Sequence, residues 1–437
     1  MSQDGPNIVY VFTDQQSARA MSCVGRLQIE TPAMDSLAEE GVRFDRAYCT
    51  YPLCTPSRAS MFTGLMPHEV EIPYNGFPIA EERRQLELGH VLSDAGYECV
   101  YGGKWHIPEI AIPEGHGFRR ICGFSDWDLA DRCIDFLRES HEAPFFLVAS
   151  YDNPHNICEW SRRQALPWGP IEDVPTEDCP NLPSNFPPPS YEPQALQQFR
   201  DSFPGSEFAP DEWRHYRHAY SRLVEKIDAS LARILEVLKE EGLEEDTLVV
   251  FSSDHGDGMG CHQWNQKWTL YEESIRIPFL MRLPGQIESG LEVSKLVSNG
   301  LDFYPTVCDF AEVEPPGDIH GRSLRPLLEG DEPSDWRENL VVETQFAKGG
   351  GPYGRAVVGE RYKYCMYSKG RYREQLIDLE NDPGEMVNLA VESRYEEMVE
   401  DYRDVLRDWI RRTDDRFFAH YAHPDRLPPV PGEGYTD

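Results

Sequence analysis

Asn7-Ile8-Val9-Tyr10-Val11-Phe12 is a short, almost wholly apolar run that ends in the polar residues Thr13-Asp14-Gln15. A strand without polar alternation is buried on both faces, which is typical of a parallel sheet covered by helices on each side. Similar apolar runs follow at residues 97–101, 145–150 and 248–251. The sequence therefore predicts four strands of one buried sheet.

Helical patterns separate these predicted strands. Apolar residues recur with helical spacing at residues 32–40, 86–95, 128–140 and 212–241. Strands that alternate with helices predict an α/β fold, here a large doubly wound domain with a mixed or parallel sheet and helices on both faces. We expect this α/β domain to occupy residues 1–335.

The pattern changes after about residue 340. Short strand patterns at 340–343, 355–359 and 362–367 are followed by a helical pattern at 394–412. Consecutive short strands favour an antiparallel sheet. We expect residues 336–437 to form a smaller C-terminal α+β subdomain, in which a helix packs on this sheet.

Residues 166–210 interrupt the alternation of strands and helices. Eleven of the 35 prolines lie there, including Pro187-Pro188-Pro189. Long irregular segments in compact domains are usually functional or disordered. Because the α/β pattern resumes afterwards, we expect an ordered surface excursion near the ligand pocket.

The composition is that of an acidic globular protein. The 437 residues are 40% hydrophobic, and 76 acidic against 42 basic residues give a net charge of −34. This charge disfavours nonspecific binding to nucleic acid or to an anionic membrane. The sequence contains no run of about 18 apolar residues, so it predicts no membrane span. A polyanionic substrate would need a local basic pocket within the acidic surface.

The first residues, Met1-Ser2-Gln3-Asp4-Gly5-Pro6, lack the basic and apolar regions of a signal peptide. The sequence as written predicts a cytoplasmic location, or a periplasmic or secreted one if a leader has been removed. The eleven cysteines show no C-x-x-C or zinc-type spacing, and we expect mostly reduced thiols. Nothing in the sequence indicates an oligomeric state.

Polar clusters follow each of the four predicted strands. Ligands of open α/β sheets bind at the carboxyl ends of the strands. Taken singly, such residues could cap helices or be solvated in loops, but their recurrence at four strand ends predicts a metal-assisted site for an anionic substrate. The clusters are Asp14-Gln15, Gly103-Lys104-Trp105-His106, Asp152-Asn153-Pro154-His155 and Asp254-His255-Gly256-Asp257, with Lys267 a little further on.

One further motif, Cys54-Thr55-Pro56-Ser57-Arg58, is compatible on its own with a buried thiol beside a helix that begins near Pro56. It resembles the C-x-P-S-R signature of type I sulfatases, in the alkaline-phosphatase-like superfamily. Further stretches resemble this family in the same order over most of the chain. They are residues 7–15, 102–106, 153–155, 252–257, 266–278, 320–324 and 376–385.

The resemblance implies a sulfuric ester hydrolase in which Cys54 is oxidised to Cα-formylglycine. The partner for this step would be a formylglycine-generating (maturation) enzyme. The aldehyde hydrates, one hydroxyl attacks sulfur, and the other later expels sulfate. The implied fold is a large α/β domain with a small C-terminal antiparallel sheet, in agreement with the pattern of strands and helices.

The same resemblance implies roles for the basic residues of the site. Arg58 would stabilise the ionised nucleophile, and Lys104 would contact that nucleophile and a sulfate oxygen. His106 would remove the proton of the second hydroxyl. His155 and Lys267 would bind sulfate and protonate or neutralise the departing alkoxide. Cations suit an anionic ester in a low-dielectric pocket, and histidine suits proton transfer near neutral pH.

A divalent cation is also implied, with Asp14, Gln15, Asp254, His255 and an oxygen of modified Cys54 as ligands. Many family members have Asp-Asp and Asp-Asn where this chain has Asp14-Gln15 and Asp254-His255. Calcium prefers oxygen ligands, whereas imidazole suits transition metals better. We expect Ca²⁺ first, with Mn²⁺, Mg²⁺ or Zn²⁺ as alternatives.

Residues near these motifs are candidates for binding the rest of the substrate, or for ordinary packing. The loop after His155 offers arginine and tryptophan, which suit an anion beside a sugar face. His215 and His218 lie three apart on a predicted helix, where an exposed helix face is the better interpretation than a metal site. The predicted substrate-binding residues are His262, Trp264, Asn265 and Arg162.

Three functions are compatible with these observations. The first is a sulfatase that removes an O-sulfate, or an N-sulfate, from a saccharide. The second is a phosphonate monoester or phosphodiester hydrolase on the same scaffold, which Gln15 and His255 favour because related hydrolases carry such pairs. The third is a catalytically silent protein that binds sulfated glycans through the same pocket and leaves Cys54 unmodified.

Overall fold

The computed structural model describes residues 5–25, 27–347 and 351–415. Its centre is an eight-stranded sheet in the order β5-β4-β6-β1-β7-β8-β2-β9. The four strands predicted from apolar runs form the middle of this sheet, and neighbours among them are parallel. They are β4 (Glu98–Gly103), β6 (Phe145–Pro154), β1 (Asn7–Asp14) and β7 (Thr247–Ser253).

The outer strands make the sheet mixed. β8 pairs antiparallel with both β7 and β2, whereas β9 and β5 are parallel to their neighbours. The predicted class, a mixed or parallel α/β sheet, is confirmed. The outer strands are β5 (Arg119–Arg120), β8 (Phe279–Arg282), β2 (Val42–Phe44) and β9 (Leu291–Val293).

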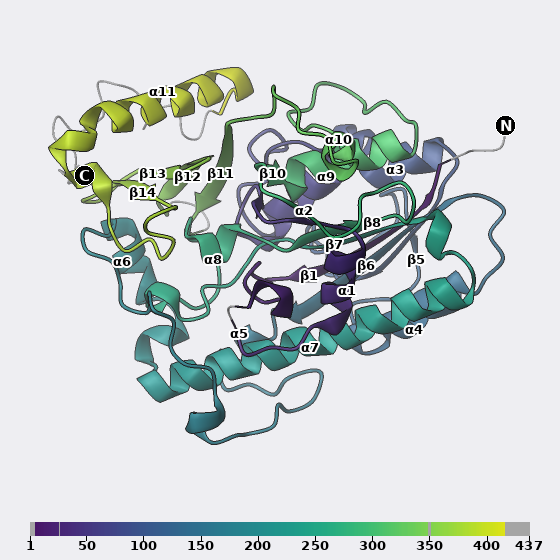
Figure 1. Ribbon diagram of the computed structural model, residues 1–437, viewed down its shortest axis with the longest axis horizontal. Helices are drawn as coiled ribbons and strands as arrows, with labels where there is room; N and C mark the ends of the chain where they lie inside the picture. The colour runs from purple at the N-terminus through teal and green to yellow at the C-terminus, as the bar shows by residue number, and fades with distance from the viewer. Residues whose placement is uncertain (1–4, 26, 348–350, 416–437) are drawn as a thin grey trace.

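Helices cover both faces of the sheet (Figure 1). Alternate residues of β1 point to opposite faces: Val9 and Val11 join one buried apolar cluster, and Tyr10 and Phe12 join the other. The first cluster is completed by α1 (Pro32–Glu40), α4 (Asp126–Leu137) and α7 (Pro210–Glu240). The second is completed by α2 (Cys54–Thr63), α3 (Leu88–Asp94) and α9 (Asn299–Phe310).

A four-stranded antiparallel sheet follows in the order β11-β12-β13-β14, and α11 packs beside it (Figure 1). Its apolar side chains belong to the same cluster as Tyr10 and Phe12 of the large sheet. The predicted division at residue 335 stays a prediction, and residues 416–437 of the predicted subdomain lie outside the described residues. The elements are β11 (Asn339–Gln345), β12 (Tyr353–Gly359), β13 (Tyr362–Tyr367), β14 (Glu374–Asp378) and α11 (Glu396–Thr413).

Short elements connect these layers. The Pro-rich residues 166–210 contain α6 and two 3₁₀ turns, Thr176–Asp178 and Pro204–Glu207. Among the described residues, no helix is both long and apolar enough to cross a membrane, and all eleven cysteines are free thiols. The remaining short elements are α5 (Ile157–Ser161), α6 (Gln194–Arg200), α8 (Glu272–Ile275), α10 (Arg325–Leu328), β3 (Ala47–Tyr48) and β10 (Val297–Ser298).

Candidate active site

The ends of the parallel strands bring the predicted site residues together. β1 ends at Asp14, and β7 is followed directly by Asp254 and His255. β4 is followed by Lys104, and Cys54 is the first residue of α2. Because the four central strands run in the same direction, these residues meet at one edge of the sheet, as the pattern of strand ends predicts.

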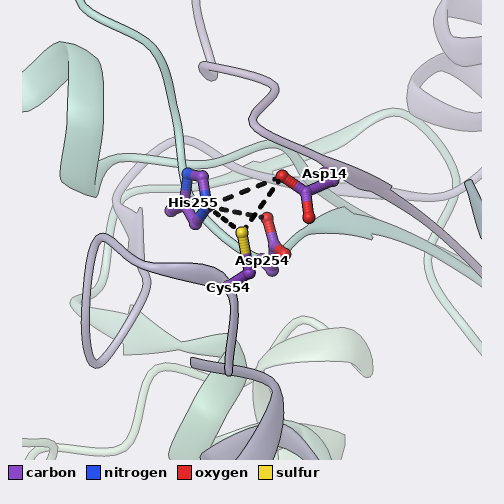
Figure 2. Close-up of side chains that lie close together, drawn as sticks. All are labelled: Asp14, Cys54, Asp254 and His255. Atoms are coloured by element: carbon purple, nitrogen blue, oxygen red, sulfur yellow. Dashed lines mark hydrogen bonds and ion pairs between the residues drawn. The ribbon is translucent and has the colours of Figure 1, made fainter. Parts of the chain in front are cut away.

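Asp14, Cys54, Asp254 and His255 form a fully buried cluster (Figure 2), in which one ligand atom of each lies within 4.8 Å of the others. The Cys54 Sγ is 3.5 Å from Asp14 Oδ1 and 3.4 Å from His255 Nε2. The other ring nitrogen, His255 Nδ1, lies 3.0 Å from the carbonyl oxygen of Gly256. As a donor to that carbonyl, Nδ1 leaves the lone pair of Nε2 directed into the cluster.

The charges of this cluster suit a bound cation. Burial opposes ionisation of Asp14, but Lys104 and Lys267 hold the pKa of its carboxyl well below the usual range. Burial and the nearby Asp14 charge raise the pKa of Asp254 to about 6. Two adjacent carboxylates, an imidazole and a sulfur therefore offer a donor set that fits a divalent cation.

Arg58 forms hydrogen bonds with the cluster and is itself fully buried. Its Nε donates to Asp254 Oδ2 at 2.7 Å, and its Nη2 donates to Asp14 Oδ2 at 3.0 Å. Its Nη1 donates to the carbonyl oxygen of Lys104 at 2.6 Å and to Ser150 Oγ at 2.9 Å. A guanidinium is a planar fork of donors, so Arg58 sets the relative positions of both carboxylates.

Two lysines also approach the Asp14 carboxylate. Lys104 Nζ lies 2.7 Å from Asp14 Oδ2 and 2.8 Å from Asp152 Oδ1. Lys267 Nζ lies 2.9 Å from the Cys54 Sγ and 3.7 Å from Asp14 Oδ1. Both ammonium groups are nearly buried, so they create a positive potential in a poorly solvated pocket, where an anion binds strongly.

The Cys54 thiol is strongly acidic in this setting. Burial and the Asp14 charge oppose its ionisation, yet Lys267, Lys104 and a hydrogen bond from His106 hold the pKa of Cys54 well below its usual range. The Nδ1 atom of His106 is buried and has no hydrogen-bond partner among the described residues. His106 is therefore placed beside the position of the nucleophile, with one nitrogen uncommitted.

His155 lies beside the same charges. Its Nδ1 is 3.8 Å from Asp152 Oδ1, and its side chain is 21% exposed. Burial, Lys104 and Lys267 lower the pKa of His155 well below its ordinary value. A neutral imidazole therefore stands at the more open side of the cluster at pH 7.

Gln15 is held by its own network. Its backbone N–H donates to Asp254 Oδ1 at 3.1 Å, and its Nε2 donates to Asp257 Oδ2 at 2.7 Å. The Cys158 thiol donates to Gln15 Oε1 at 3.8 Å. The amide oxygen keeps a second lone pair, and the predicted ligand role of Gln15 stays a prediction.

The predicted substrate residues that follow β7 are packed rather than open. His262, Trp264 and Asn265 are each at most 1% exposed. Trp264 Nε1 donates to the carbonyl oxygen of Lys267 at 3.0 Å, so it supports the loop of that lysine. Asn265 Oδ1 accepts from the backbone N–H of Gly205 at 3.2 Å. Their predicted contact with substrate stays a prediction.

The segment after His155 leaves Arg162 exposed, and its predicted contact with substrate stays a prediction. The expectation of an exposed helix face at His215 and His218 is wrong, because the Pro-rich excursion folds over this part of α7. His215 contacts Thr176 Oγ1 at 3.1 Å and Cys179 Sγ at 3.4 Å. His218 is only 9% exposed.

Two acids of the site were not assigned roles from sequence. Asp152 pairs with Lys104. Asp257 accepts a hydrogen bond from Gln15, and its two carboxylate oxygens lie 2.9 and 3.0 Å from the Tyr216 hydroxyl. Asp152 lies in the last residues of β6 and Asp257 follows β7, and both belong to the polar clusters that the sequence showed. Their partners come from distant segments, which local spacing does not reveal.

Comparison with known proteins agrees with this geometry. The family described as Sulfatase matches residues 6–313, and the one described as N-sulphoglucosamine sulphohydrolase, C-terminal, matches residues 260–412. A Delta 4,5-hexuronate-2-O-sulfatase of Bacteroides thetaiotaomicron is 30% identical over 95% of this chain and 91% of that protein. An ulvan-active sulfatase of Formosa agariphila is 29% identical over 94% of this chain and 82% of that protein.

Solved structures give the same result. The structure of a 2-O GAG sulfatase superposes with a TM-score of 0.84 and 28% identity, covering 98% of this chain and 99% of that one. The match therefore includes both the large sheet and the small C-terminal sheet. The chain belongs to the sulfatase family of the alkaline phosphatase-like superfamily, and it is a sulfatase enzyme.

Proposed function

We propose that this sulfatase releases sulfate from a sulfated saccharide, using a formylglycine made from Cys54 and one divalent cation. The observation that carries the proposal is the placement of Cys54. Its sulfur lies within 3.5 Å of an Asp14 oxygen, His255 Nε2 and the Lys267 ammonium. A buried thiol with no functional role has no need of a metal-type donor set and two lysines around it.

The Cys54 Sγ stands in for an oxygen of the hydrated formylglycine. In that form the residue supplies one hydroxyl as nucleophile and a second one for the later release of sulfate. Asp14, Asp254 and His255, together with Gln15, would hold the cation, which supplies positive charge that lowers the pKa of the nucleophile and offsets the charge of sulfate.

The residues around the nucleophile then have distinct tasks. Arg58 fixes both carboxylates and, with its buried positive charge, stabilises the ionised hydroxyl. Lys104, which pairs with Asp14 and Asp152, contacts the nucleophile and one sulfate oxygen. His106 takes the proton of the second hydroxyl, because its ring lies within hydrogen-bonding reach of residue 54.

The alkoxide leaving group requires a proton or a positive charge on the side of the sulfate sulfur atom that lies opposite the attacking hydroxyl. Lys267 and His155 provide them, because both lie beside the cluster and neither is needed to hold the strand ends together. His155 is neutral before substrate binds. The approach of an anionic ester favours its protonated form, so binding itself prepares the acid that the alkoxide needs.

Calcium is our first choice for the cation, because two carboxylates and an amide oxygen are hard ligands. The imidazole of His255 makes Mn²⁺, Mg²⁺ or Zn²⁺ the alternatives. Titration of the metal-free protein with each chloride salt by calorimetry distinguishes them. A clear preference for Zn²⁺ over Ca²⁺ would overturn the first choice.

A saccharide substrate is supported by the relatives, which are described as acting on a hexuronate and on ulvan. The exposed Arg162, on the loop after His155, adds a positive charge for a neighbouring acidic group. We therefore favour an O-sulfate, with an N-sulfate as the less favoured bond. Arg162, His262, Trp264 and Asn265 are the proposed substrate-binding residues.

A phosphonate monoester or phosphodiester is the second candidate substrate. His255 in the cluster and Gln15 beside it favour this alternative, because they reduce the negative charge that would repel a phosphoryl group. The same nucleophile and the same cations would serve both reactions. The rates of turnover of a sulfate ester and of a phosphodiester with the same leaving group distinguish the two candidates.

Mass spectrometry across Cys54 is the first experiment. After co-expression with a formylglycine-generating enzyme, we expect the peptide to lose about 18 Da. The Cys54→Ala variant is the control and should show no such change. An unmodified thiol under these conditions would favour a silent glycan-binding protein and would contradict the proposal.

The converted enzyme is then assayed on sulfated disaccharides, aryl sulfates and phosphodiesters. We expect sulfate release from at least one disaccharide, with a kcat/KM well above that for any phosphodiester. Cys54→Ala should be inactive on all of them. A phosphodiester that turns over faster than every sulfate ester would establish the second candidate.

A further inference from the structure

A second polar pocket lies apart from the catalytic cluster. It has a volume of about 470 Å³. Its wall contains Arg19 from the segment after β1, Arg217 from α7, Met259 and Cys261 from the loop after β7, and residues 180–185 of the Pro-rich excursion. None of the described residues that line it is acidic, although the chain carries a net charge of −34.

Arg217 is a buried cation that is not ion-paired directly. It is 6% exposed, and none of the ion pairs among the described residues includes it, although the charge of Glu273 acts on it from beyond ion-pair distance. Its Nη1 donates to the carbonyl oxygen of Met259 at 2.7 Å, while its Nε is buried and has no partner among the described residues. A guanidinium has five N–H donors, so most of the hydrogen-bonding capacity of Arg217 is unused.

Such a group is costly for the folded state. Buried charges are normally paired, because removing them from water is otherwise strongly unfavourable. Burial lowers the pKa of Arg217 and the charge of Arg19 acts in the same direction, whereas Cys261 and Glu273 oppose this shift only in part. A bound anion would accept hydrogen bonds from the unused donors of Arg217 and offset its charge.

Other groups in the wall add to the same potential. Arg19 pairs with Glu273 and donates to the carbonyl oxygen of Pro383 at 3.1 Å. Asn181 and Ser184 are exposed at the rim. A planar guanidinium can bind an oxyanion through two parallel hydrogen bonds, and uncharged donors beside it suit the remaining oxygens.

We propose that this pocket is an oxyanion-binding site, in which Arg217 and Arg19 hold a sulfate or carboxylate group. The group comes either from free inorganic sulfate or from an acidic sugar. The volume falls within the range of small-ligand sites. The site supplies the local basic pocket that an acidic protein needs in order to receive an anionic ligand.

The pocket and the catalytic cluster share neighbouring residues. Tyr216, which precedes Arg217 on α7, donates to Asp257, and Asp257 accepts from Gln15 beside Asp14. The oxyanion site is therefore separate from the catalytic cluster but is connected to it through α7 and this chain of hydrogen bonds. The proposal goes beyond the proposed function and does not depend on it.

Calorimetric binding tests the proposal without any turnover. The full-length protein carries Lys267→Met, so that sulfate binds weakly at the catalytic cluster, and it is titrated with sodium sulfate and with an unsulfated disaccharide that contains a uronic acid. We expect at least one of them to bind, and to bind at least tenfold more weakly after Arg217→Met. Arg233→Met, which removes an exposed arginine of the same helix, should leave binding unchanged.

The pattern of loss identifies the source of the oxyanion. Loss of sulfate binding assigns the site to the free anion, and loss of disaccharide binding assigns it to a sugar carboxylate. Arg217→Lys, which keeps the charge but not the two-point fork, should bind with intermediate affinity even if Arg217→Met does not fold. Equal binding by parent and variants, or no binding of either ligand by the parent, would overturn the proposal.

Discussion

Arg58 donates to groups at the ends of all four central strands. Asp14 ends β1, Asp254 follows β7, Ser150 lies in β6, and the carbonyl oxygen of Lys104 follows β4. The side chain that the sequence motif predicts as a catalytic group is thus also the one that fixes the geometry of the strand ends. Its two tasks should be lost together.

Replacement of Arg58 by methionine tests this at the level of one side chain. The change keeps the approximate volume but leaves two buried carboxylates without their shared cation. We expect the free energy of unfolding to fall by about 3–5 kcal/mol, as measured by urea denaturation of the metal-free protein. Arg233→Met removes an exposed ion pair and should cost less than about 1 kcal/mol. Equal losses in the two variants would contradict this account of Arg58.

Asp257 lies behind Gln15 and should tune the metal site without touching the metal. It accepts from Gln15 Nε2 and so orients the amide whose oxygen is the proposed ligand. Asp257→Asn should weaken Ca²⁺ binding by roughly 10-fold or more, because partners of metal ligands have effects of this size. Calorimetric titration measures it, with Asp246→Asn, an exposed acid before β7, as the control. Unchanged affinity would remove Gln15 from the ligand set.

The sequence predicts those site residues whose positions follow from the strand that directly precedes them. Asp14, Lys104 and Asp254 each follow an apolar strand, so their meeting follows from the parallel sheet alone. The partners Asp152 and Asp257 could not be assigned, because their contacts depend on how distant segments approach. The burial of Trp264 could not be predicted either, since a tryptophan close in sequence to a predicted catalytic lysine can pack equally well on a sugar or in a core.

At the scale of elements, the free backbone N–H groups at the start of α1 are capped by a carboxylate from another helix. Thr31 occupies its N-cap but makes no capping hydrogen bond. Instead Asp228 of α7 accepts from the backbone N–H groups of Ala33 and Met34 at 3.1 and 2.9 Å. A carboxylate at a helix N-terminus satisfies free N–H groups and favours the helix dipole.

Asp228→Ala should therefore destabilise the protein by about 1–2 kcal/mol, the usual cost of losing a cap. Asp228→Asn keeps one acceptor oxygen and should lose less. The midpoint of urea unfolding at pH 7.5 measures both. Asp211→Ala, at the exposed start of α7, provides the comparison. A midpoint for Asp228→Ala equal to that of Asp211→Ala would show that the N–H groups of α1 need no acceptor from α7.

The sequence predicts long elements better than short ones. The central strands and α7 carry an uninterrupted apolar pattern, so their existence and type were predictable. The outer strands β8 and β2 were not predicted, because they are short and gain their stability from pairing with neighbours. The same holds for β14, which completes the small sheet beside β13.

At the scale of the whole molecule, a buried histidine joins the chain's distant parts. His68, in the loop after α2, pairs with Glu343 of β11 and contacts the carbonyl oxygen of Thr413, the last residue of α11. Burial opposes the charged form, but Glu343 raises the pKa of His68 to about 9. The loop after α2, the small sheet and the end of α11 are thereby connected by one titratable contact.

This contact predicts how stability depends on pH. The folded-state pKa of His68 lies above the ordinary histidine value of 6.5, so the stabilisation it provides is fully present below pH 6.5 and is lost as pH rises through about 9. The loss should not exceed about 3 kcal/mol. Urea unfolding at several pH values should show this slope in the parent and in His90→Gln, but not in His68→Gln. An equal slope in all three proteins would contradict the prediction.

The complete burial of Cys54 has a consequence for the order of events in the life of the chain. An oxidising enzyme must touch the thiol, yet in the folded protein no surface of residue 54 reaches solvent. On the proposed mechanism, conversion of Cys54 therefore competes with folding in time, and only a chain that meets its maturation enzyme before it folds would become active. A chain that folds before conversion would bury Cys54 and would keep an unconverted thiol at this position while it stays folded. Activity in a cell would then be limited by this race, not by the number of folded molecules.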